Sequence, residues 1–351
     1  MVYYTDPCLA GGPMVRRPFF LFSQRVPPGG NSHDSDMNML LFTHNDECPL
    51  AERRPAVTMG VFDGVHLGHK AIIEKLRQEA RRRGSPTLAI TFSPHPRQAL
   101  GRAAPAGICS LEQRIIRLAE AGVDAVWVLP FTQELAKVPA RAFAEEYFHR
   151  RLNAGAVVLG ELAVFGQGRD GNAGTLAEWA KSWSTDVSAV PPLLVDGGVV
   201  SSTAIRLAVQ EGRLDKAAAY LGRRVSVEGT VVHGQGHGHK LGFPTLNLDP
   251  HHELRPPPGV YITETVMDGV SRPSITNIGR PPTEPEIESG LVDFLIETHL
   301  LDFEGDVYGR TAEVFFHHKA RDVMRFADLD GLVAQVQKDL AAAREWFSKQ
   351  G

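Results

Sequence analysis

The sequence predicts an α/β half followed by a mostly β half that ends in a helix, and three observations lead to this prediction. From Pro55 to about Leu221, short apolar runs alternate with helical patterns, as in a parallel sheet covered by helices on both faces. After Gly222, apolar runs are separated by stretches rich in glycine and proline, as in the turns of an all-β unit. The chain closes with an apolar stripe at helical spacing from Leu329 to Phe347.

The elements of the α/β half follow one another along the chain. The clearest is a helix over 70–83, because Ile72, Ile73, Leu76 and Ala80 share one face. The three arginines in its last turn suit the negative end of the helix dipole, and the glycine after them suits the end of a helix. The other expected elements are helices over 113–121 and 143–151 and strands over 56–59, 87–91, 125–129 and 156–159.

The second half contains three clear strand patterns, over 225–232, 259–266 and 292–301. Alternation in the last of them places Ile296 and Leu300 on an apolar face with Val292 and Phe294, and Glu297 on the opposite face with Asp293 and His299.

Domain organisation follows from this change of pattern. We place the boundary near Gly222, with a first domain over 37–222 and a second over 223–351. Residues 1–36 are expected to be a disordered extension, or to precede a start near Met37, because glycine, proline and polar residues dominate them. The apolar run within them is too short for a signal peptide.

Bulk properties exclude several classes of protein. A formal net charge of -4 argues against a protein that coats nucleic acid, which usually has a basic excess. No apolar run reaches membrane-spanning length. The three cysteines, Cys8, Cys48 and Cys109, lack metal-ligand spacing and cannot form a fully paired disulfide framework, so a cytoplasmic location is expected.

The segment GVFDGVHLGH, residues 60–69, lies between an expected strand and an expected helix. A helix N-terminus offers unpaired N–H groups and a partial positive charge to a phosphate. His66 and His69 are about one helical turn apart, so both would aim at the same point and donate hydrogen bonds to an α-phosphate under attack. The alternative interpretation is a glycine-rich turn with two surface histidines.

This segment resembles the ATP-binding motif of HxGH nucleotidylyltransferases. In its full form it resembles the FMN adenylyltransferase domain of bacterial bifunctional riboflavin kinase/FAD synthetases. The resemblance implies a Rossmann-like nucleotidyltransferase domain in which His66 and His69 are catalytic. It also implies a set of ATP-binding residues: Gly60, Phe62, Asp63, Gly64 and Gly68.

Two further segments extend the resemblance. TFSPHP, residues 91–96, is similar to the family's TFxPHP and implies flavin binding by His95 and Pro96, although two prolines would also make a rigid strand exit. SSTAIR, residues 201–206, is similar to the family's SSTxIR and implies phosphate binding by Ser202, Thr203 and Arg206. Helix capping explains the hydroxyls. It does not explain Arg206, one turn in at the positive end of a helix, where a cation is disfavoured unless an anion is near.

One segment departs from the family. Where the family has a sequence like GExFxFG with Asp or Asn at the third position, this chain has GELAVFG at 160–166. Leu162 replaces the polar residue and Ala163 the aromatic one, so a polar contact to the nucleotide or flavin is lost. Adenylyl transfer is therefore the less secure of the two implied activities.

A second glycine-rich loop lies in HGQGHGHKLGFPTLN, residues 233–247. Its four glycines suit a loop whose N–H groups wrap phosphates, although the P-loop order is absent and a flexible hairpin is the alternative. The glycines are Gly234, Gly236, Gly238 and Gly242. Thr245 and Asn247 follow and offer oxygen atoms to Mg2+.

This loop resembles the riboflavin kinase signature GxxLGFPTxN, and IETHLLDF at 296–303 is similar to the family's E-x-H-L-L-D-F strand. The resemblance implies a small closed β-barrel kinase domain with a C-terminal helix. A kinase acting on an alcohol needs a carboxylate for the hydroxyl proton, and Glu297 is the candidate. Asn277, in a turn similar to the family's NIG, and Arg321 are the implied flavin-binding residues.

Three departures affect flavin affinity or lid position more than phosphate chemistry. Pro281 stands where the family has Arg in NIGxRPT, His239 where the glycine-rich loop often has Arg, and Val323 where Glu is expected.

Together these features predict an enzyme that phosphorylates riboflavin to FMN and adenylylates FMN to FAD, with ATP and Mg2+ serving both sites. Its partners are these small molecules, without nucleic acid or membrane. Three alternatives remain open: a riboflavin kinase with a decayed adenylyl site, an adenylyltransferase for another phosphate such as a nicotinamide or pantetheine precursor, and a flavin-binding protein without catalysis.

Overall fold

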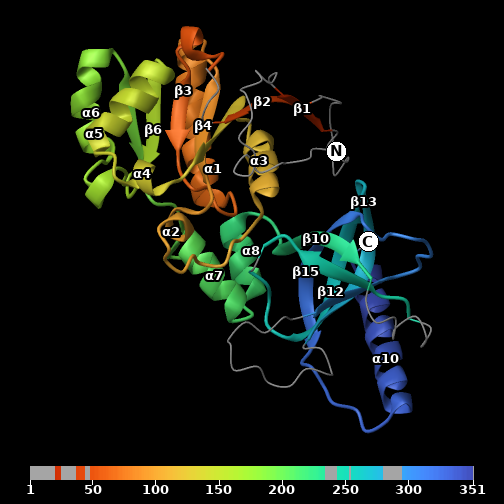
Figure 1. Ribbon diagram of the computed structural model, residues 1–351. Helices are drawn as coiled ribbons and strands as arrows, with labels where there is room; N and C mark the ends of the chain where they lie inside the picture. The colour runs from red at the N-terminus through yellow and green to blue at the C-terminus, as the bar shows by residue number, and fades with distance from the viewer. Residues whose placement is uncertain are drawn as a thin grey trace, which may run out of the picture.

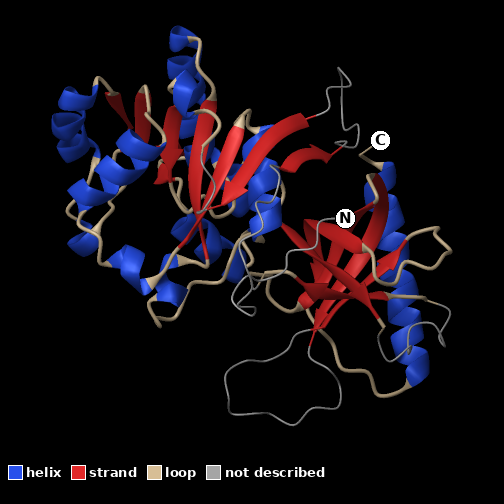
Figure 2. Ribbon diagram, turned by 45° about the horizontal axis from the view of Figure 1, so that its top comes forward, coloured by secondary structure: helices blue, strands red, loops and turns tan. Residues whose placement is uncertain are grey.

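The structure is a computed structural model that describes residues 20–24, 37–43, 48–233, 243–252, 254–279 and 295–350. Figure 1 shows the sheet with its helices, coloured red to green, beside the later barrel and its terminal helix, coloured teal to blue. The two halves differ in secondary structure as the sequence predicts: mixed helix and strand first, then mostly strand (Figure 2).

The first half is built on a sheet with the strand order β1-β2-β5-β4-β3-β6-β7 in the described residues. All neighbouring strands from β2 to β7 are parallel, and only β1 is antiparallel to its neighbour. The strands are β1 (Phe20–Gln24), β2 (Met37–Thr43), β3 (Ala56–Met59), β4 (Thr87–Ser93), β5 (Ala125–Pro130), β6 (Ala156–Gly160) and β7 (Asp186–Val190).

Helices cover both faces of this sheet. On one face, α1 (Leu67–Arg83) packs with Ile73, Leu76 and Ala80 turned toward β3, β4 and β6, and Gly84 ends it at φ 63°. α3 (Leu111–Glu120) lies on this face too. The opposite face is covered by α5 (Ala140–Ala144), by a π-helical continuation over Glu145–Arg151 and by α6 (Ala173–Ala180).

Several shorter elements connect these layers or lead to the second half. They are the helices α2 (Pro96–Ala99), α4 (Gln133–Ala136), α7 (Ser202–Gln210) and α8 (Leu214–Leu221), the 3-10 turns Ala51–Arg53, Gln167–Arg169 and Lys181–Trp183, and the hairpin β8 (Leu194–Val195) and β9 (Gly198–Val199).

The second half is a closed antiparallel barrel with the order β10-β11-β14-β13-β12-β15, in which β15 pairs with β10. The strands are β10 (Ser226–Val232), β11 (Leu246–Pro250), β12 (Gly259–Met267), β13 (Val270–Gly279), β14 (Leu295–Leu300) and β15 (Thr311–Arg321). The terminal helix α10 (Leu329–Ser348) packs through Leu340 and Ala343 on the outside of the barrel, over Val260, Ile262 and Ile275.

Part of the barrel interior is polar. Five fully buried hydroxyl groups form a continuous chain of hydrogen bonds of 2.8 Å each, from Thr265 through Ser274, Thr263 and Thr276 to Thr298. The rest of the interior is apolar and includes Tyr261, Ile278, Ile296 and Phe316. Every interior hydroxyl in this chain has a partner, as burial of a polar group requires.

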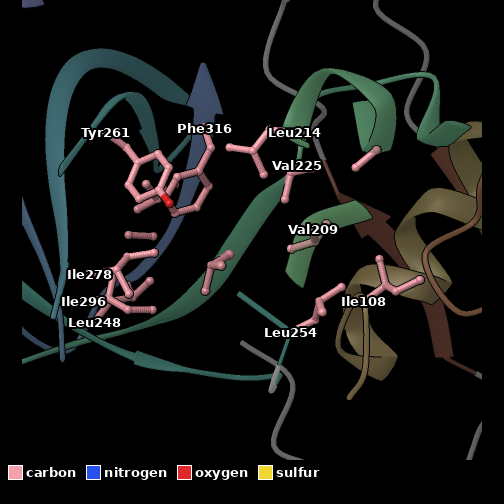
Figure 3. Close-up of a cluster of buried hydrophobic side chains, with 14 of the residues drawn as sticks. Ile108, Val209, Leu214, Val225, Leu248, Leu254, Tyr261, Ile278, Ile296 and Phe316 are labelled. Carbon is pink, nitrogen blue, oxygen red and sulfur yellow. The ribbon is translucent and has the colours of Figure 1, made fainter. Parts of the chain in front are cut away.

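The two halves share one apolar cluster (Figure 3). Ile108, Val209 and Leu214 of the first half belong to the same cluster as Val225 and Phe316 of the second. Beside it, one carboxylate oxygen of Glu313 on β15 accepts hydrogen bonds from Gln113, Arg117 and Ser226 at 2.9, 2.7 and 2.6 Å. The halves therefore meet through a packed and hydrogen-bonded junction, not through a bare linker.

The fold class is as the sequence predicts, and so are the main helices and strands of the α/β half. Phe20–Gln24 forms a strand within the range expected to be a disordered extension, and the remainder of 1–36 lies outside the described residues. Asn277 and Gly279, expected in a turn, instead lie at the end of β13.

We place the domain boundary near Gly222, between the end of α8 and the start of β10, as a prediction.

Candidate active sites

The backbone between β3 and α1 is unusual at three of its residues. Phe62, Gly64 and Val65 have φ values of 52°, 80° and 41°. The left-handed region suits glycine but costs a phenylalanine or a β-branched valine about 1–3 kcal/mol each. Both side chains are fully buried, so packing holds this conformation in place. Strain of this kind gathers at functional sites, where the surrounding structure over-determines the backbone.

This loop ends at His66, which is the N-cap of α1. Its Nδ1 accepts a hydrogen bond from the backbone N–H of His69 at 3.3 Å. Because Nδ1 accepts, a neutral His66 carries its proton on Nε2 and presents an N–H donor. The rings of His66 and His69 stack with centroids 3.6 Å apart, so the two side chains lie together as their spacing predicts. A Cβ on Gly68 would come within 3.2 Å of the His66 ring.

His66 is buried and His69 is partly buried. Burial lowers the pKa of His66 to about 4; Asp63 opposes this change, and the guanidinium groups of Arg223 and Arg206 add to it. Burial also holds the pKa of His69 well below its usual range, with further contributions from His66 and Arg114. At pH 7 both rings are therefore neutral, and they offer hydrogen bonds to a phosphate without adding net charge.

Asp63 is a structural centre of the loop. Its carboxylate accepts from the backbone N–H groups of Ile108 and Cys109 and forms an ion pair with Arg206. Its carbonyl accepts from the Ser202 hydroxyl at 3.1 Å. Asp63 is 4% exposed, so it fixes the loop from inside.

The other residues of SSTAIR lie around this centre. Arg206 Nε donates to the carbonyl of Ala106 at 2.7 Å, so the anion beside this cation is Asp63. Ser201 is the N-cap of α7, and Thr203 is exposed. Gly60 lies against the Phe62 ring, whose buried edge also contacts His69. Phe62 and Asp63 thus support the loop from its buried side. A ligand-binding role for them stays a prediction.

His95 and Pro96 begin the short helix α2. His95 is its N-cap and accepts a hydrogen bond from the backbone N–H of Arg97 at 3.2 Å, which leaves Nε2 as the donor when the ring is neutral. Burial lowers the pKa of His95, and Arg206 contributes. This capping is the rigid exit that the prolines predict, and flavin binding by His95 and Pro96 stays a prediction.

The segment GELAVFG, residues 160–166, differs from the family sequence, and its middle residues form a surface loop. Leu162 is 74% exposed and Val164 is also exposed, whereas Ala163 packs against the sheet core. A Cβ on Gly166 would meet Ala140 at 2.3 Å, so the loop lies tightly on the start of α5. The apolar Leu162 therefore faces outward from a well-anchored loop.

In the barrel, the strand register brings three predicted residues side by side. Glu297 on β14 pairs with Asn247 on β11 and with Asn277 on β13. Cross-strand partners share a face of the sheet, and Asn277 Nδ2 donates to Glu297 Oε2 at 3.4 Å. Their neighbours along each strand fill the barrel interior, so this row points outward. It lies next to Ile275, which α10 covers.

The residues before Asn247 lead toward this row. His299 Nδ1, also on the outer face, contacts the carbonyl of Pro244 at 2.8 Å and ties the chain before Thr245 to β14. Thr245 directly precedes β11. The expected phosphate loop lies outside the described residues, with Gly234, Gly236, Gly238 and Gly242, as do His239 and Pro281.

Arg321 has a partner within the chain. Its Nε and Nη2 hold both carboxylate oxygens of Asp339 on α10, at 2.7–3.1 Å. Asp339 is 8% exposed, so this pair fastens the helix to the end of β15. Val323, two residues on, is exposed. The predicted contact of Arg321 with flavin stays a prediction beside this structural role.

Three residues near the sites were not predicted from the sequence. Arg114 on α3 is buried and donates to Thr91 Oγ1 and to the carbonyl of Phe92, beneath the TFSPHP exit. Cys109 Sγ accepts from Gly64 N–H at 3.2 Å, and Arg223 Nη2 donates to the Gly64 carbonyl at 2.7 Å. Each partner is distant in sequence, so local patterns hold no signal for these contacts.

Comparison with known proteins agrees with this arrangement. The FAD synthetase family model matches residues 49–204 and the riboflavin kinase family model matches residues 221–347. The bifunctional riboflavin kinase/FMN adenylyltransferase of Escherichia coli K12 is 35% identical over 293 residues, 83% of this chain and 92% of that protein. This chain belongs to that family.

Two further likenesses cover most of the chain. The Pseudomonas fluorescens bifunctional riboflavin kinase/FMN adenylyltransferase is 37% identical over 288 residues, 82% of this chain and 91% of that protein. A crystal structure titled as a macrolide-efflux protein from Streptococcus pneumoniae has a TM-score of 0.76 at 27% identity, over 87% of this chain and 99% of that one. In the described part of this chain, no helix is long and apolar enough to span a bilayer.

Proposed function

We propose that the two halves hold separate active sites for consecutive reactions. The barrel transfers a phosphoryl group from ATP to riboflavin and makes FMN, and the sheet half transfers an adenylyl group from ATP to FMN and makes FAD. The observation that carries this proposal is the Asn247, Glu297 and Asn277 row on the barrel, together with the neutral His66 and His69 pair at the head of α1.

In the kinase site, Glu297 accepts the proton of the terminal ribityl hydroxyl as that oxygen attacks the γ-phosphorus of ATP, and ADP leaves. Asn277 donates to the same carboxylate and so orients it. The glycine-rich loop before Thr245 holds the phosphates through its N–H groups. Arg321 keeps α10 against the barrel and thereby shapes the flavin side of the site.

Mg2+ fits the donors beside this carboxylate. Thr245 supplies a hydroxyl oxygen and Asn247 an amide oxygen next to Glu297, and Mg2+ in such sites takes few protein oxygens and completes its shell with water and phosphate. No group of three or more His, Cys, Asp or Glu that could hold a metal occurs in the described residues, so a cage made of these residues alone is not proposed. Bound there, the ion would neutralise charge on the transferring phosphate.

In the adenylyl site, the FMN phosphate attacks the α-phosphorus of ATP and pyrophosphate leaves. His66 and His69 donate N–H hydrogen bonds to the oxygens on which charge builds. The first turn of α1, with Gly68, lets the backbone approach the phosphates. Arg206, Ser202 and Thr203 border this site at the head of α7, and His95 with Pro96 borders its flavin side.

The partners of the protein are thus riboflavin, FMN and ATP, and the proposed location is the cytoplasm. The cysteine count motivates that location, because three thiols do not make a paired disulfide framework.

The test uses purified protein with riboflavin, ATP and Mg2+, followed by chromatographic separation of riboflavin, FMN and FAD. We expect both products. Glu297→Gln should abolish FMN formation and leave FAD formation from supplied FMN intact, and His66→Ala should do the reverse. Glu304→Gln, at an exposed carboxylate after the same strand, is the matched control and should change neither activity.

Other outcomes select the alternatives. If both activities fall together in Glu297→Gln, the two-site proposal is wrong. FMN without FAD from the unmodified protein would indicate a kinase with a silent adenylyl site. Adenylylation of another phosphate substrate in place of FMN, found in a substrate panel, would change the assignment of that site. Tight flavin binding without ATP turnover would indicate a flavin-binding protein.

A further inference from the structure

Gly64, in the loop that carries His66, is held at both of its backbone polar groups. Its N–H donates to Cys109 Sγ at 3.2 Å, within the first half. Its carbonyl accepts from Arg223 Nη2 at 2.7 Å. Arg223 lies between Gly222, which ends α8, and β10 of the barrel. One of the two contacts therefore comes from the junction with the second half.

This contact matters because the loop is strained. Phe62, Gly64 and Val65 all have positive φ values, and such a conformation persists only where several contacts over-determine it. On one side, Asp63 is bound by the N–H groups of Ile108 and Cys109. On the other side, Arg223 is the contact that fixes the orientation of the peptide after Gly64, two residues before His66.

Arg223 is itself set in a charged junction. Burial, and after it the neighbouring Arg117, lower its pKa to about 10, against the opposing effect of Cys109 and the carboxylates of Glu313 and Glu120. It therefore remains a cation at pH 7. Glu313 on β15 in turn receives hydrogen bonds from Arg117 and from Ser226, the first residue of β10. The Arg223 guanidinium thus lies close to the barrel and donates its hydrogen bond to the loop that carries His66.

We propose that Arg223 is a positioning residue for adenylyl transfer, through which the barrel half holds the Gly64 carbonyl and sets the place of His66. The proposal rests on the proposed role of His66 in adenylyl transfer. It means that the catalytic loop of the first half is completed by a contact from the start of the second. Misplacement of a catalytic group by about 1 Å costs on the order of 100-fold in rate, so the contact has a measurable consequence.

The test measures kcat and KM for FAD formation from supplied FMN and ATP, with the riboflavin kinase rate of the same preparation as an internal reference. Arg223→Ala should lower kcat for FAD formation by roughly 10- to 100-fold, with a smaller effect on the KM for ATP, because the substrate still binds while His66 is displaced. The kinase rate should not change. Arg223→Lys keeps a donor within reach and should recover part of kcat. Arg224→Ala, at the exposed neighbouring arginine, should leave both rates unchanged.

A pH profile separates positioning from a general loss of structure. The charged or titratable groups around His66 are Asp63, Arg223 and Arg206, with His69 stacked on its ring. Because the cation of Arg223 lowers the pKa of His66, Arg223→Gln, which keeps a donor but removes the charge, should move the acidic limb of kcat to higher pH.

The outcomes distinguish this proposal from the function on which it rests. If the unmodified protein forms no FAD, the proposed adenylyl activity fails. If it forms FAD and Arg223→Ala retains full kcat, the role of Arg223 is refuted. Equal losses of FAD formation and kinase activity, or a loss in Arg224→Ala of the same size, would also overturn it. Should Arg223→Ala not fold, unchanged kcat and pH profile in both Arg223→Lys and Arg223→Gln would have the same meaning.

Discussion

Acidification is expected to destabilise the sheet half through His66. The ordinary pKa of a histidine is 6.5, and in the folded protein burial lowers that of His66 to about 4. Between these two values the unfolded chain binds a proton at this position that the folded chain does not. The stabilisation is therefore fully present above pH 6.5 and is lost as the pH falls toward 4.

The size of this effect follows from the same two values. The gap between 6.5 and about 4, at about 1.4 kcal/mol per pH unit, corresponds to about 3 kcal/mol of unfolding free energy. Because His66 is 5% exposed, solvent screening does not reduce this free energy appreciably. A typical domain has a free energy of unfolding of about 5–15 kcal/mol, so a loss of this size is a large fraction of it.

The assay is urea unfolding between pH 7 and 4.5, followed by tryptophan fluorescence. Three of the four tryptophans, Trp127, Trp179 and Trp183, belong to the sheet half, so the signal reports mainly on that half. The comparison is His66→Asn, because asparagine keeps an acceptor at the N-cap of α1 and removes the titrating ring. All carboxylates are common to both proteins, so the difference between their unfolding free energies isolates the effect of His66.

We expect this difference to shift by about 2.5 kcal/mol against the unmodified protein as the pH falls from 7 to 4.5. His318→Asn, at an exposed histidine on β15, controls for the loss of an imidazole that lies away from the loop. A flat difference curve for His66→Asn would refute the reasoning, because His66 would then have to be protonated, or freely solvated, in the folded state.

Two further predictions concern the loops of the adenylyl site. Gly64→Ala should lower the free energy of unfolding, measured by thermal denaturation, by about 1–3 kcal/mol. The φ of Gly64 is 80°, and a Cβ at this residue would lie 2.8 Å from Ile108 Cγ2. Gly101→Ala, with φ 65° and open space around it, should cost less, and equal losses would contradict the predicted clash. Leu162→Asn should leave stability unchanged, because Leu162 is 74% exposed, and should raise kcat/KM for FAD formation about threefold to tenfold by adding one hydrogen bond. The same change at exposed Leu194 is the control, and an unchanged kcat/KM would remove the basis for a decayed adenylyl site.

Local patterns in the sequence predict those parts of the site that depend on neighbouring residues. A strand, three glycines and an amphipathic helix in direct succession are enough to place His66 and His69 at one helix N-terminus. Alternation along β14 is enough to place Glu297 on the face opposite Ile296. Both predictions rest on the fixed periods of helices and strands.

Contacts between distant segments could not be predicted in this way. Arg206 stands 143 residues from Asp63, and Arg223 stands 159 residues from Gly64, so no sequence period relates them. Arg206, one turn into α7 at its positive end, indicated an anion, and the anion in the structure is Asp63. β15 was missed although Ala312, Val314 and Phe316 alternate with outward residues, because charged and histidine residues obscure its apolar face.

The hydroxyl chain inside the barrel has a consequence for how strands choose their partners. Four hydrogen bonds in series join its five hydroxyls and so link β12, β13 and β14 into one relay with Thr298 at one end. A slip of one residue in any of these strands would turn its hydroxyls to the outside and leave the remaining ones buried without partners. An aliphatic interior would tolerate a slip of two residues, which keeps each side chain on its face, more readily than these paired hydroxyls do. The relay instead selects a single alignment of β12, β13 and β14, and that alignment is the one that sets Glu297 beside Asn277.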